Sequence, residues 1–189
     1  MQDHLDRRKV LALGGAALTF AVCNPAFAAP LSGVRSRPLP PTRSLSFYNL
    51  HTGESLTTTY CVDGSCVPDS MAEIRHVLRD FRTGQEHDID VRLLDLLSRL
   101  KAKAETNKPF QVISGYRSPK TNQMLRRTST GVARRSLHMS GEAIDIRLPG
   151  RDLKWLRQTA LDLKKGGVGY YPKSDFVHVD VGRVRQWAG

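Results

Sequence analysis

Three polar residues lie in segments that are otherwise apolar, and their side chains are of the kinds that bind metal ions. Asp145 lies in the middle of the apolar residues 143–146, and His178 lies within residues 176–179. His138 precedes Asp145 by seven positions. A buried, unpaired carboxylate costs several kcal/mol, so Asp145 requires a cationic partner. Two imidazoles and one carboxylate are a ligand set for Zn²⁺, with the fourth position left to water as in catalytic sites.

Each of these residues also has a purely structural explanation. Asp145 can pair with an arginine, and a single buried histidine is more often hydrogen-bonded within the core than bound to a metal. The three together favour the metal site, because the other four histidines lack such apolar surroundings. We expect those four to be solvent-exposed: His4, His51, His76 and His87.

Two carboxylates near His178 are candidates for the general base of a hydrolytic reaction. Asp180 follows His178 by two positions, so in a strand its side chain lies on the same face. Asp175 precedes His178 by three positions and faces away unless the chain bends before Phe176, which Ser174 permits. A second role for Asp180 is to orient His178 from outside the metal. The strand alternation leaves both assignments open.

Arg117 is a candidate for stabilising negative charge at the site. It lies in the turn at residues 116–118, directly after a predicted strand at residues 110–114. A guanidinium in that place can hold a carboxylate or a developing oxyanion. The alternative is an ordinary solvated surface arginine.

The hydrophobic pattern predicts a mixed α+β domain that positions these residues. Two β-prone runs around a turn, residues 45–48 and 56–60, predict a hairpin. A capping box at Ser70 predicts a first helix, with apolar residues at helical spacing at Met71, Ile74, Leu78 and Phe81. Further helices are predicted over residues 91–105, 119–127 and 152–164, and further strands over residues 110–114, 142–148 and 176–181.

The first 28 residues have the features of a twin-arginine signal peptide. Arg7 and Arg8 precede an apolar run at residues 10–23, and residues 26–28 form a small-x-small cleavage site. The run has 14 positions, whereas a membrane-spanning helix needs about 20, so an uncleaved anchor is the weaker alternative. We therefore expect a signal peptide at residues 1–28, a proline-rich flexible linker at 29–43 and one domain at 44–189, located in the periplasm without stable membrane insertion.

Export leaves two cysteines, Cys61 and Cys66, on either side of an Asp-Gly turn. In an oxidising compartment this spacing predicts a small disulfide across a hairpin end. The alternatives are two free thiols or, with less support, a metal site.

The net charge of +11, from 29 basic and 18 acidic residues, suggests a polyanionic partner. Without residues 1–28 the chain keeps 26 basic and 16 acidic residues, a charge of +10. Basic pairs at residues 126–127 and 134–135 flank the segment before His138, where they would raise the local concentration of an acidic substrate. We expect no nucleic-acid binding, because the chain is exported and contains no helix-turn-helix pattern.

The candidate ligands form part of a larger motif. The residues Ser136, His138, Gly141, Ala143 and Asp145, followed by residues 176–180, resemble the metallopeptidases of the D-alanyl-D-alanine carboxypeptidase and endopeptidase group, peptidase family M15. Further segments are similar to one branch of that family, the murein endopeptidases: residues 50–54, 113–118, 131–133 and 166–172. The similarity extends from about residue 45 to residue 187.

The resemblance implies a fold, a set of roles and a substrate. The implied fold is a small single α+β domain in which a central antiparallel sheet carries the zinc site and helices pack on the sheet. His138, Asp145 and His178 are the implied Zn²⁺ ligands, Arg117 lies near the site, and Asp175 matches the position of the family's acidic base. The implied partner and substrate is peptidoglycan, cut by a monomer at D-Ala–meso-diaminopimelate or diaminopimelate–diaminopimelate cross-links.

Two other functions stay open on the residues alone. One is a D,D- or L,D-carboxypeptidase acting on muropeptides. The other is a non-catalytic, zinc-containing module that binds the cell wall. Pocket shape sets the choice between endopeptidase and carboxypeptidase action and between the two cross-links, and the sequence does not determine that shape. A binding module would pellet with sacculi and release no new muropeptides.

Overall fold

The computed structural model describes residues 38–129 and 131–189. The predicted signal peptide at 1–28 and the first part of the predicted linker lie outside the described residues. The last predicted linker residue, Arg43, is the first residue of a strand. The described residues form one compact unit.

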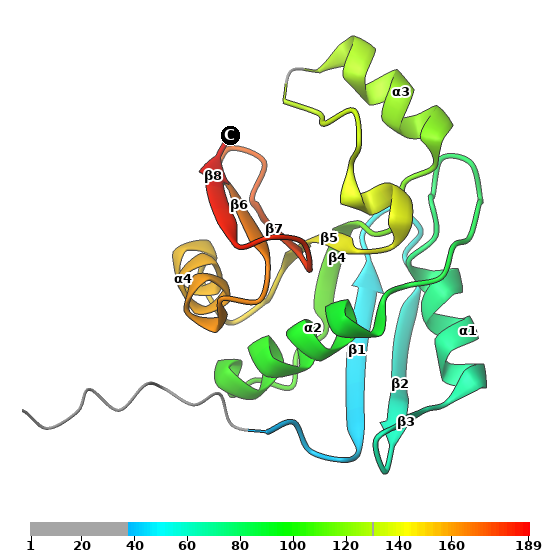
Figure 1. Cartoon of the computed structure of the whole chain (residues 1–189), viewed down its shortest axis with the longest axis vertical. Helices are drawn as coiled ribbons and strands as arrows, with labels where there is room; N and C mark the ends of the chain where they lie inside the picture. Colours follow the sequence, from blue (N-terminus) through cyan, green and yellow to red (C-terminus); the bar gives the residue numbers. More distant parts are fainter. Residues whose placement is uncertain (1–37, 130) are drawn as a thin grey trace, which may run out of the picture. The chain divides into compact units, whose positions relative to one another are not determined.

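Eight strands within the described residues form one mixed sheet (Figure 1). The strand order is β3-β2-β1-β4-β5-β7-β6-β8. The strand pairs β4–β5, β5–β7 and β7–β6 are antiparallel, as predicted for the part of the sheet that carries the site. The pairs β1–β4 and β6–β8 are parallel. The strands are β1 Arg43–Asn49, β2 Ser55–Val62, β3 Ser65–Cys66, β4 Phe110–Ser114, β5 Ala143–Arg147, β6 Gly167–Tyr171, β7 Phe176–Asp180 and β8 Arg185–Ala188.

The helices lie at the places that the hydrophobic periodicity predicts. They are α1 Pro68–Val77, α2 Val91–Ala104, α3 Pro119–Thr128 and α4 Leu153–Leu163, with a 3₁₀ turn η1 at Leu137–Ser140. Asp90 caps α2 by accepting a hydrogen bond from the backbone N–H of Arg92, and Asp152 caps α4 in the same way from Trp155. Among the helices of the described residues, none combines the length and the apolar composition that crossing a membrane requires.

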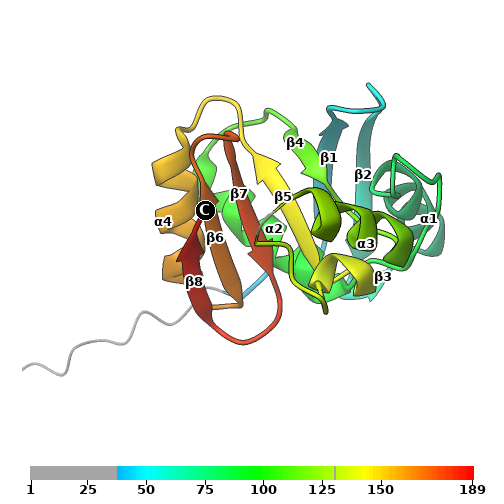
Figure 2. The same cartoon turned by 90° about the horizontal axis from the view of Figure 1, so that it is seen from above.

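Alternation along the central strands separates a core face from a site face. Ile144 and Ile146 of β5 are fully buried in the hydrophobic core, together with Val177 and Val179 of β7. The buried leucines of α2 and Leu156 of α4 belong to the same core, and α4 lies beside β6 and β7 (Figure 2). Asp145 and His178 alternate with these residues, so their side chains point to the opposite face.

The prediction for the first helix was wrong at both ends. The helix begins at Pro68, a residue favoured in the first turn, and Val67 is the N-cap without a side-chain hydrogen bond. Ser70, the predicted cap, is buried within the helix. The helix ends at Val77, so Phe81 lies beyond it and stacks on the ring of His51, with the centroids 3.7 Å apart.

Three strands of the structure were not predicted. β3 is two residues long, β6 contains two glycines, and β8 is short and polar. The predicted disulfide is not found: Cys61 and Cys66 pair across β2 and β3 as register partners, but both are free thiols.

Candidate metal centre

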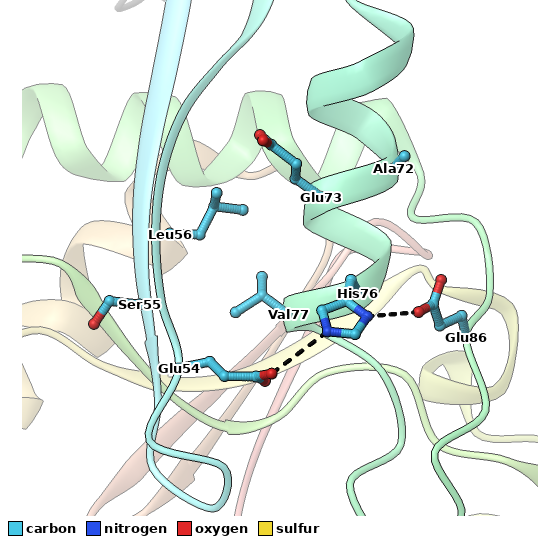
Figure 3. Close-up of a pocket in the computed structure, with 8 residues that line it drawn as sticks. All are labelled: Glu54, Ser55, Leu56, Ala72, Glu73, His76, Val77 and Glu86. Carbon is cyan, nitrogen blue, oxygen red and sulfur yellow. Dashed lines mark hydrogen bonds and ion pairs between the residues drawn. The ribbon is translucent and has the colours of Figure 1, made fainter.

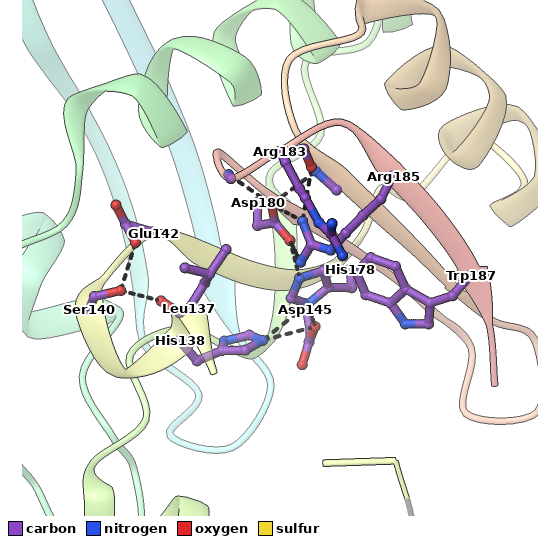
Figure 4. Close-up of polar contacts among 12 residues, drawn as sticks. Leu137, His138, Ser140, Glu142, Asp145, His178, Asp180, Arg183, Arg185 and Trp187 are labelled. Carbon is purple, nitrogen blue, oxygen red and sulfur yellow. Dashed lines mark hydrogen bonds and ion pairs between the residues drawn. The ribbon is translucent and has the colours of Figure 1, made fainter. Parts of the chain in front are cut away.

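Two of the candidate ligands lie opposite each other in adjacent strands. Asp145 of β5 and His178 of β7 are register partners, so the sheet itself holds their side chains on one face. η1 brings His138 to the same place (Figure 4). Gly141 ends η1 with φ +67°, and a Cβ there would lie 2.0 Å from the Asp88 carbonyl oxygen, so only glycine fits.

The three side chains converge at ligand distances. His138 Nε2 lies 3.2 Å from His178 Nδ1, and Asp145 Oδ1 lies 2.8 Å from His178 Nδ1 and 3.3 Å from His138 Nε2. Nitrogen and oxygen ligands of a tetrahedral Zn²⁺, each about 2.0–2.1 Å from the ion, lie about 3.3 Å apart. All three residues are buried. The donor set therefore fits a zinc ion with little rearrangement.

The outer hydrogen bonds of the two histidines orient their inner nitrogens, His138 Nε2 and His178 Nδ1, towards Asp145. His138 Nδ1 donates to the Gly115 carbonyl at 2.8 Å, and His178 Nε2 donates to Asp180 Oδ2 at 3.1 Å. When neither inner nitrogen carries a proton, two imidazole lone pairs and a carboxylate oxygen face one another. The 2.8 Å contact between His178 Nδ1 and Asp145 Oδ1 holds a proton when no cation is bound, and a metal ion would take the place of that proton.

The electrostatics of the cluster favour a bound cation. Burial alone raises the pKa of Asp145, but His138 and His178 outweigh it and hold that pKa well below its usual range, so the carboxylate is charged. Burial lowers the pKa of His138. Burial also acts to lower the pKa of His178, but its hydrogen bonds to Asp145 and Asp180 give a net increase. The cluster thus holds a charged carboxylate beside His138, whose neutral, metal-binding form is favoured by burial.

Asp180 contacts the outer side of His178, away from the converging atoms. Its Oδ1 accepts the backbone N–H groups of Gly167 and Gly182, both at 2.9 Å, and its Oδ2 accepts from His178. Arg185 donates to both oxygens, at 3.0 and 2.7 Å. Burial acts to raise the pKa of Asp180, but these hydrogen bonds hold it well below its usual range. Asp180 is completely buried, charged and saturated with donors.

Arg117 lies at the cluster, as predicted. Its Nη2 is 3.5 Å from Asp145 Oδ2, the oxygen that points away from the histidines, and its backbone N–H donates to the His138 carbonyl. The side chain is 13% exposed, and burial lowers its pKa. Buried Asp80, which the sequence did not single out, accepts the backbone N–H of Ser118 and so fixes the turn that carries Arg117.

Asp175 is exposed at the end of the turn before β7. Its φ of +53° bends the chain at the place where the sequence allowed a bend. The carboxylate bonds to Arg147 Nη1 at 2.5 Å, and Arg147 lies two residues after Asp145 on the same face of β5. Asp175 therefore lies towards the site face, although none of the contacts within the described residues joins it to the cluster.

An aromatic group beside His178 was missed by the sequence analysis. Gly169 of β6 is the register partner of His178, and Trp187 of β8 is the partner of Gly169. The indole ring lies 5.1 Å from the His178 ring, centroid to centroid (Figure 4). Its Nε1 donates to Tyr171 Oη at 2.8 Å. A Cβ on Gly169 would lie 2.7 Å from the indole, so the glycine is what allows this packing. The sequence feature that could have indicated this packing is the glycine-rich run followed by aromatic residues, at positions 166–171.

The remaining described histidines are exposed, as predicted. His76 lines a cavity of about 500 Å³ between β2 and α1, together with Glu54 and Glu86 (Figure 3). Its Nδ1 lies 2.7 Å from Glu86 and its Nε2 lies 3.4 Å from Glu54. Both ring nitrogens of His76 thus have carboxylate partners, and within the described residues only His138, Asp145 and His178 form a group that could hold a metal.

Comparison with known proteins places this site in a family. The sequence model described as "Peptidoglycan L,D-endopeptidase MepK", of the M15 peptidases, matches residues 37–187. The chain is 45% identical to the peptidoglycan L,D-endopeptidase MepK of Escherichia coli (strain K12), over 96% of this chain and 97% of that protein. It is 39% identical to the probable peptidoglycan L,D-endopeptidase MepK of Haemophilus influenzae, over 97% of this chain and 96% of that protein. The chain therefore belongs to the M15 peptidases, in the peptidoglycan L,D-endopeptidase branch.

Proposed function

We propose that this protein is a zinc-dependent endopeptidase that cuts peptide cross-links of peptidoglycan. The observation that carries the proposal is the meeting of three buried ligand atoms, from His138, Asp145 and His178, at distances that suit one shared metal ion. Membership of a peptidoglycan peptidase family supports the same activity. Zn²⁺ is the ion whose preferred ligands and tetrahedral spacing this donor set matches.

The relatives' names favour one of the two cross-links that the sequence left open. An L,D-endopeptidase cuts between the carbonyl of an L-centre and the amine of a D-centre. The diaminopimelate–diaminopimelate link is of this kind, whereas the D-Ala–diaminopimelate link joins two D-centres. We therefore assign the diaminopimelate–diaminopimelate link as the substrate. The bond that is cut is then an internal peptide bond, whereas a carboxypeptidase cuts a terminal one.

The side chains divide the remaining tasks of hydrolysis. Zn²⁺, when bound by His138, Asp145 and His178, lowers the pKa of water towards 7 and polarises the scissile carbonyl. Asp175 takes the proton of the attacking water and passes it to the leaving amine. Asp180 is unsuited to that task because all its lone pairs are engaged on the far side of the His178 ring, and it serves instead to orient that ring.

Arg117 has donor capacity left for the substrate. Its Nη2 lies 3.5 Å from Asp145 Oδ2 and from Ser114 Oγ, and no hydrogen bond or ion pair within the described residues engages its Nη1. A partly buried guanidinium next to the reacting carbonyl stabilises the negative charge that develops on the carbonyl oxygen. We assign this role to Arg117.

The proposed location is the periplasm, where peptidoglycan lies. Residues 1–28 act as a cleaved twin-arginine signal, residues 29–43 as a linker and residues 44–189 as a monomeric peptidase domain. N-terminal sequencing of the protein recovered from the periplasm should begin at Ala29. Recovery of the uncleaved chain in the membrane fraction would contradict this assignment.

Digestion of purified sacculi tests the proposed activity. Muropeptide separation should show the loss of diaminopimelate–diaminopimelate dimers, and a chelator should prevent that loss. Replacing His76, a histidine outside the metal centre, with Ala gives a control variant that should retain activity. Three results would overturn the proposal: loss of D-Ala-linked dimers alone, release of terminal residues from intact dimers, or binding to sacculi without new muropeptides.

A further inference from the structure

Positive charge is concentrated in one segment that contains no acidic residue. Residues 106–141 include seven Lys or Arg and no Asp or Glu. Two of the seven, Lys108 and Arg117, lie outside α3 and the chain that follows it. The other five are exposed and define what we call the basic arm: Lys120, Arg126, Arg127, Arg134 and Arg135.

The charges of the basic arm are not neutralised within the described part of the chain. No carboxylate there pairs with any of its five side chains, and they make no hydrogen bonds to other described residues. Most arginines elsewhere do have such partners, for example Arg79 with Glu54 and Arg92 with Asp90. The arm is therefore a local excess of positive charge that an external anion can neutralise.

The basic arm is joined at both ends to residues of the metal centre. α3 starts directly after Arg117, and the Ser118 side chain caps the helix by accepting the Thr121 N–H. Asn122 donates to the Ala133 carbonyl at 3.1 Å, which ties the returning chain, with Arg134 and Arg135, to α3. The chain then enters η1, which carries His138 (Figure 1). A polymeric substrate could therefore place one of its bonds at the metal centre while an anionic group elsewhere on the same polymer binds the arm.

We infer that the basic arm is a docking surface for the free carboxylates of peptide stems next to the one being cut. The choice of peptidoglycan rests on the proposed function. The five positive charges of the arm match a polymer that bears repeated carboxylates. Arginine side chains bind carboxylates with paired hydrogen bonds. An anionic lipid surface fits less well, because Met124 is the one large apolar side chain of α3 that is exposed, too little for insertion.

Two variants of equal charge test the arm. In the arm variant, Arg126, Arg127, Arg134 and Arg135 are replaced by Gln. In the control variant, four exposed lysines outside the arm are replaced by Gln: Lys103, Lys154, Lys164 and Lys165. Each protein is stripped of metal and pelleted with intact sacculi at low and high salt, and the loaded enzymes are then assayed on sacculi and on a small soluble cross-linked dimer.

The arm variant should bind sacculi about ten-fold more weakly at low salt, and the deficit should shrink at high salt. Its KM on sacculi should rise, with cleavage of the soluble dimer unchanged, while the control variant should match the wild type in every assay. Equal weakening in both variants would overturn the inference, and so would unchanged binding of the arm variant. Loss of binding to phosphatidylglycerol vesicles without loss of binding to sacculi would assign the arm to lipid.

The assays distinguish failure of the proposed function from failure of the docking inference. A wild-type enzyme that leaves the soluble dimer intact refutes the peptidase assignment. Pelleting of the metal-free proteins still tests the arm in that case, because it needs no catalysis.

Discussion

His178 has a different task at each of its ring nitrogens. Nδ1 faces His138 and Asp145, where a metal ion fits, and Nε2 donates to Asp180. This arrangement explains why two aspartates near one histidine have different roles. Asp180 fixes the tautomer and the ring plane, whereas Asp175 stays exposed and is bound by a single arginine.

Replacing the two aspartates one at a time separates these roles. Asp175→Ala should retain Zn²⁺ binding and lose turnover by a factor of about 10²–10⁴, because the proposed general base is removed. Asp180→Ala should bind Zn²⁺ about 10–100-fold more weakly, because His178 loses its outer partner. Metal content and steady-state rates measure both effects. Loss of zinc from the Asp175 variant with full activity in the Asp180 variant would reverse the assignment.

The strands act on the site through their register. Asp145, His178, Gly169 and Trp187 lie side by side across β5, β7, β6 and β8. The indole ring packs over the glycine and against the His178 ring, so an outer strand contributes to the position of a ligand in a central one. Gly169 is conformationally costly in a strand, and its presence is explained by this close approach.

Gly169→Ala should displace Trp187 and so disturb His178. We expect a loss of about 1–3 kcal/mol in the free energy of unfolding, as for other overpacked sites, together with weaker zinc binding. Chemical denaturation and zinc titration measure the two effects. In the double variant with Trp187→Leu, the steric conflict is relieved, so the effects should be less than additive. Full additivity would contradict the contact as the cause.

An ion pair ties the β1–β2 turn to the end of α1, and it gives a pH-dependent contribution to stability. Arg79 donates to both oxygens of Glu54, at 2.7 and 3.0 Å. These hydrogen bonds, with one from Thr52, lower the pKa of Glu54 from 4.5 to about 2. Because the folded-state pKa is depressed, the contribution is complete above pH 4.5 and is lost as the pH falls towards 2.

Glu54→Gln should therefore cost about 1 kcal/mol at pH 7, a value limited by the partial exposure of the pair. The difference from the wild type should shrink at pH 3. Urea unfolding of the zinc-free proteins at both pH values measures it, with Glu105→Gln, at an 85% exposed side chain, as the control. A difference that is the same at both pH values would show that the ion pair is not its cause.

The sequence predicts most of these elements, and the exceptions have physical reasons. A charge inside an apolar strand is visible in the sequence, which is why Asp145 and His178 were found. The sequence did not decide whether the chain bends at Asp175, because the bend depends on a left-handed backbone conformation that non-glycine residues rarely adopt. Strands β6 and β8 were missed because glycine and polar residues give weak strand signals. Only the pairing of β6 with β7, and of β8 with β6, reveals them.

At the scale of the whole molecule, structural stability and chemistry are assigned to opposite faces of one sheet. α2 and α4 belong to the core on one face, while the metal centre lies on the other, next to η1 and the start of α3. The positive charge of the chain is concentrated beside that second face, in a segment free of acidic residues. No step of the proposed hydrolysis is assigned to the basic arm in that segment.

The central claim is that His138, Asp145 and His178 hold one zinc ion that peptide hydrolysis requires. Titration of the metal-free protein with Zn²⁺, followed by cleavage of a purified diaminopimelate-linked dimer, tests this claim most directly. Activity should be absent at first, rise linearly and reach its plateau at one equivalent of zinc. Cleavage by the metal-free protein, or an intact dimer at every zinc concentration, would contradict it.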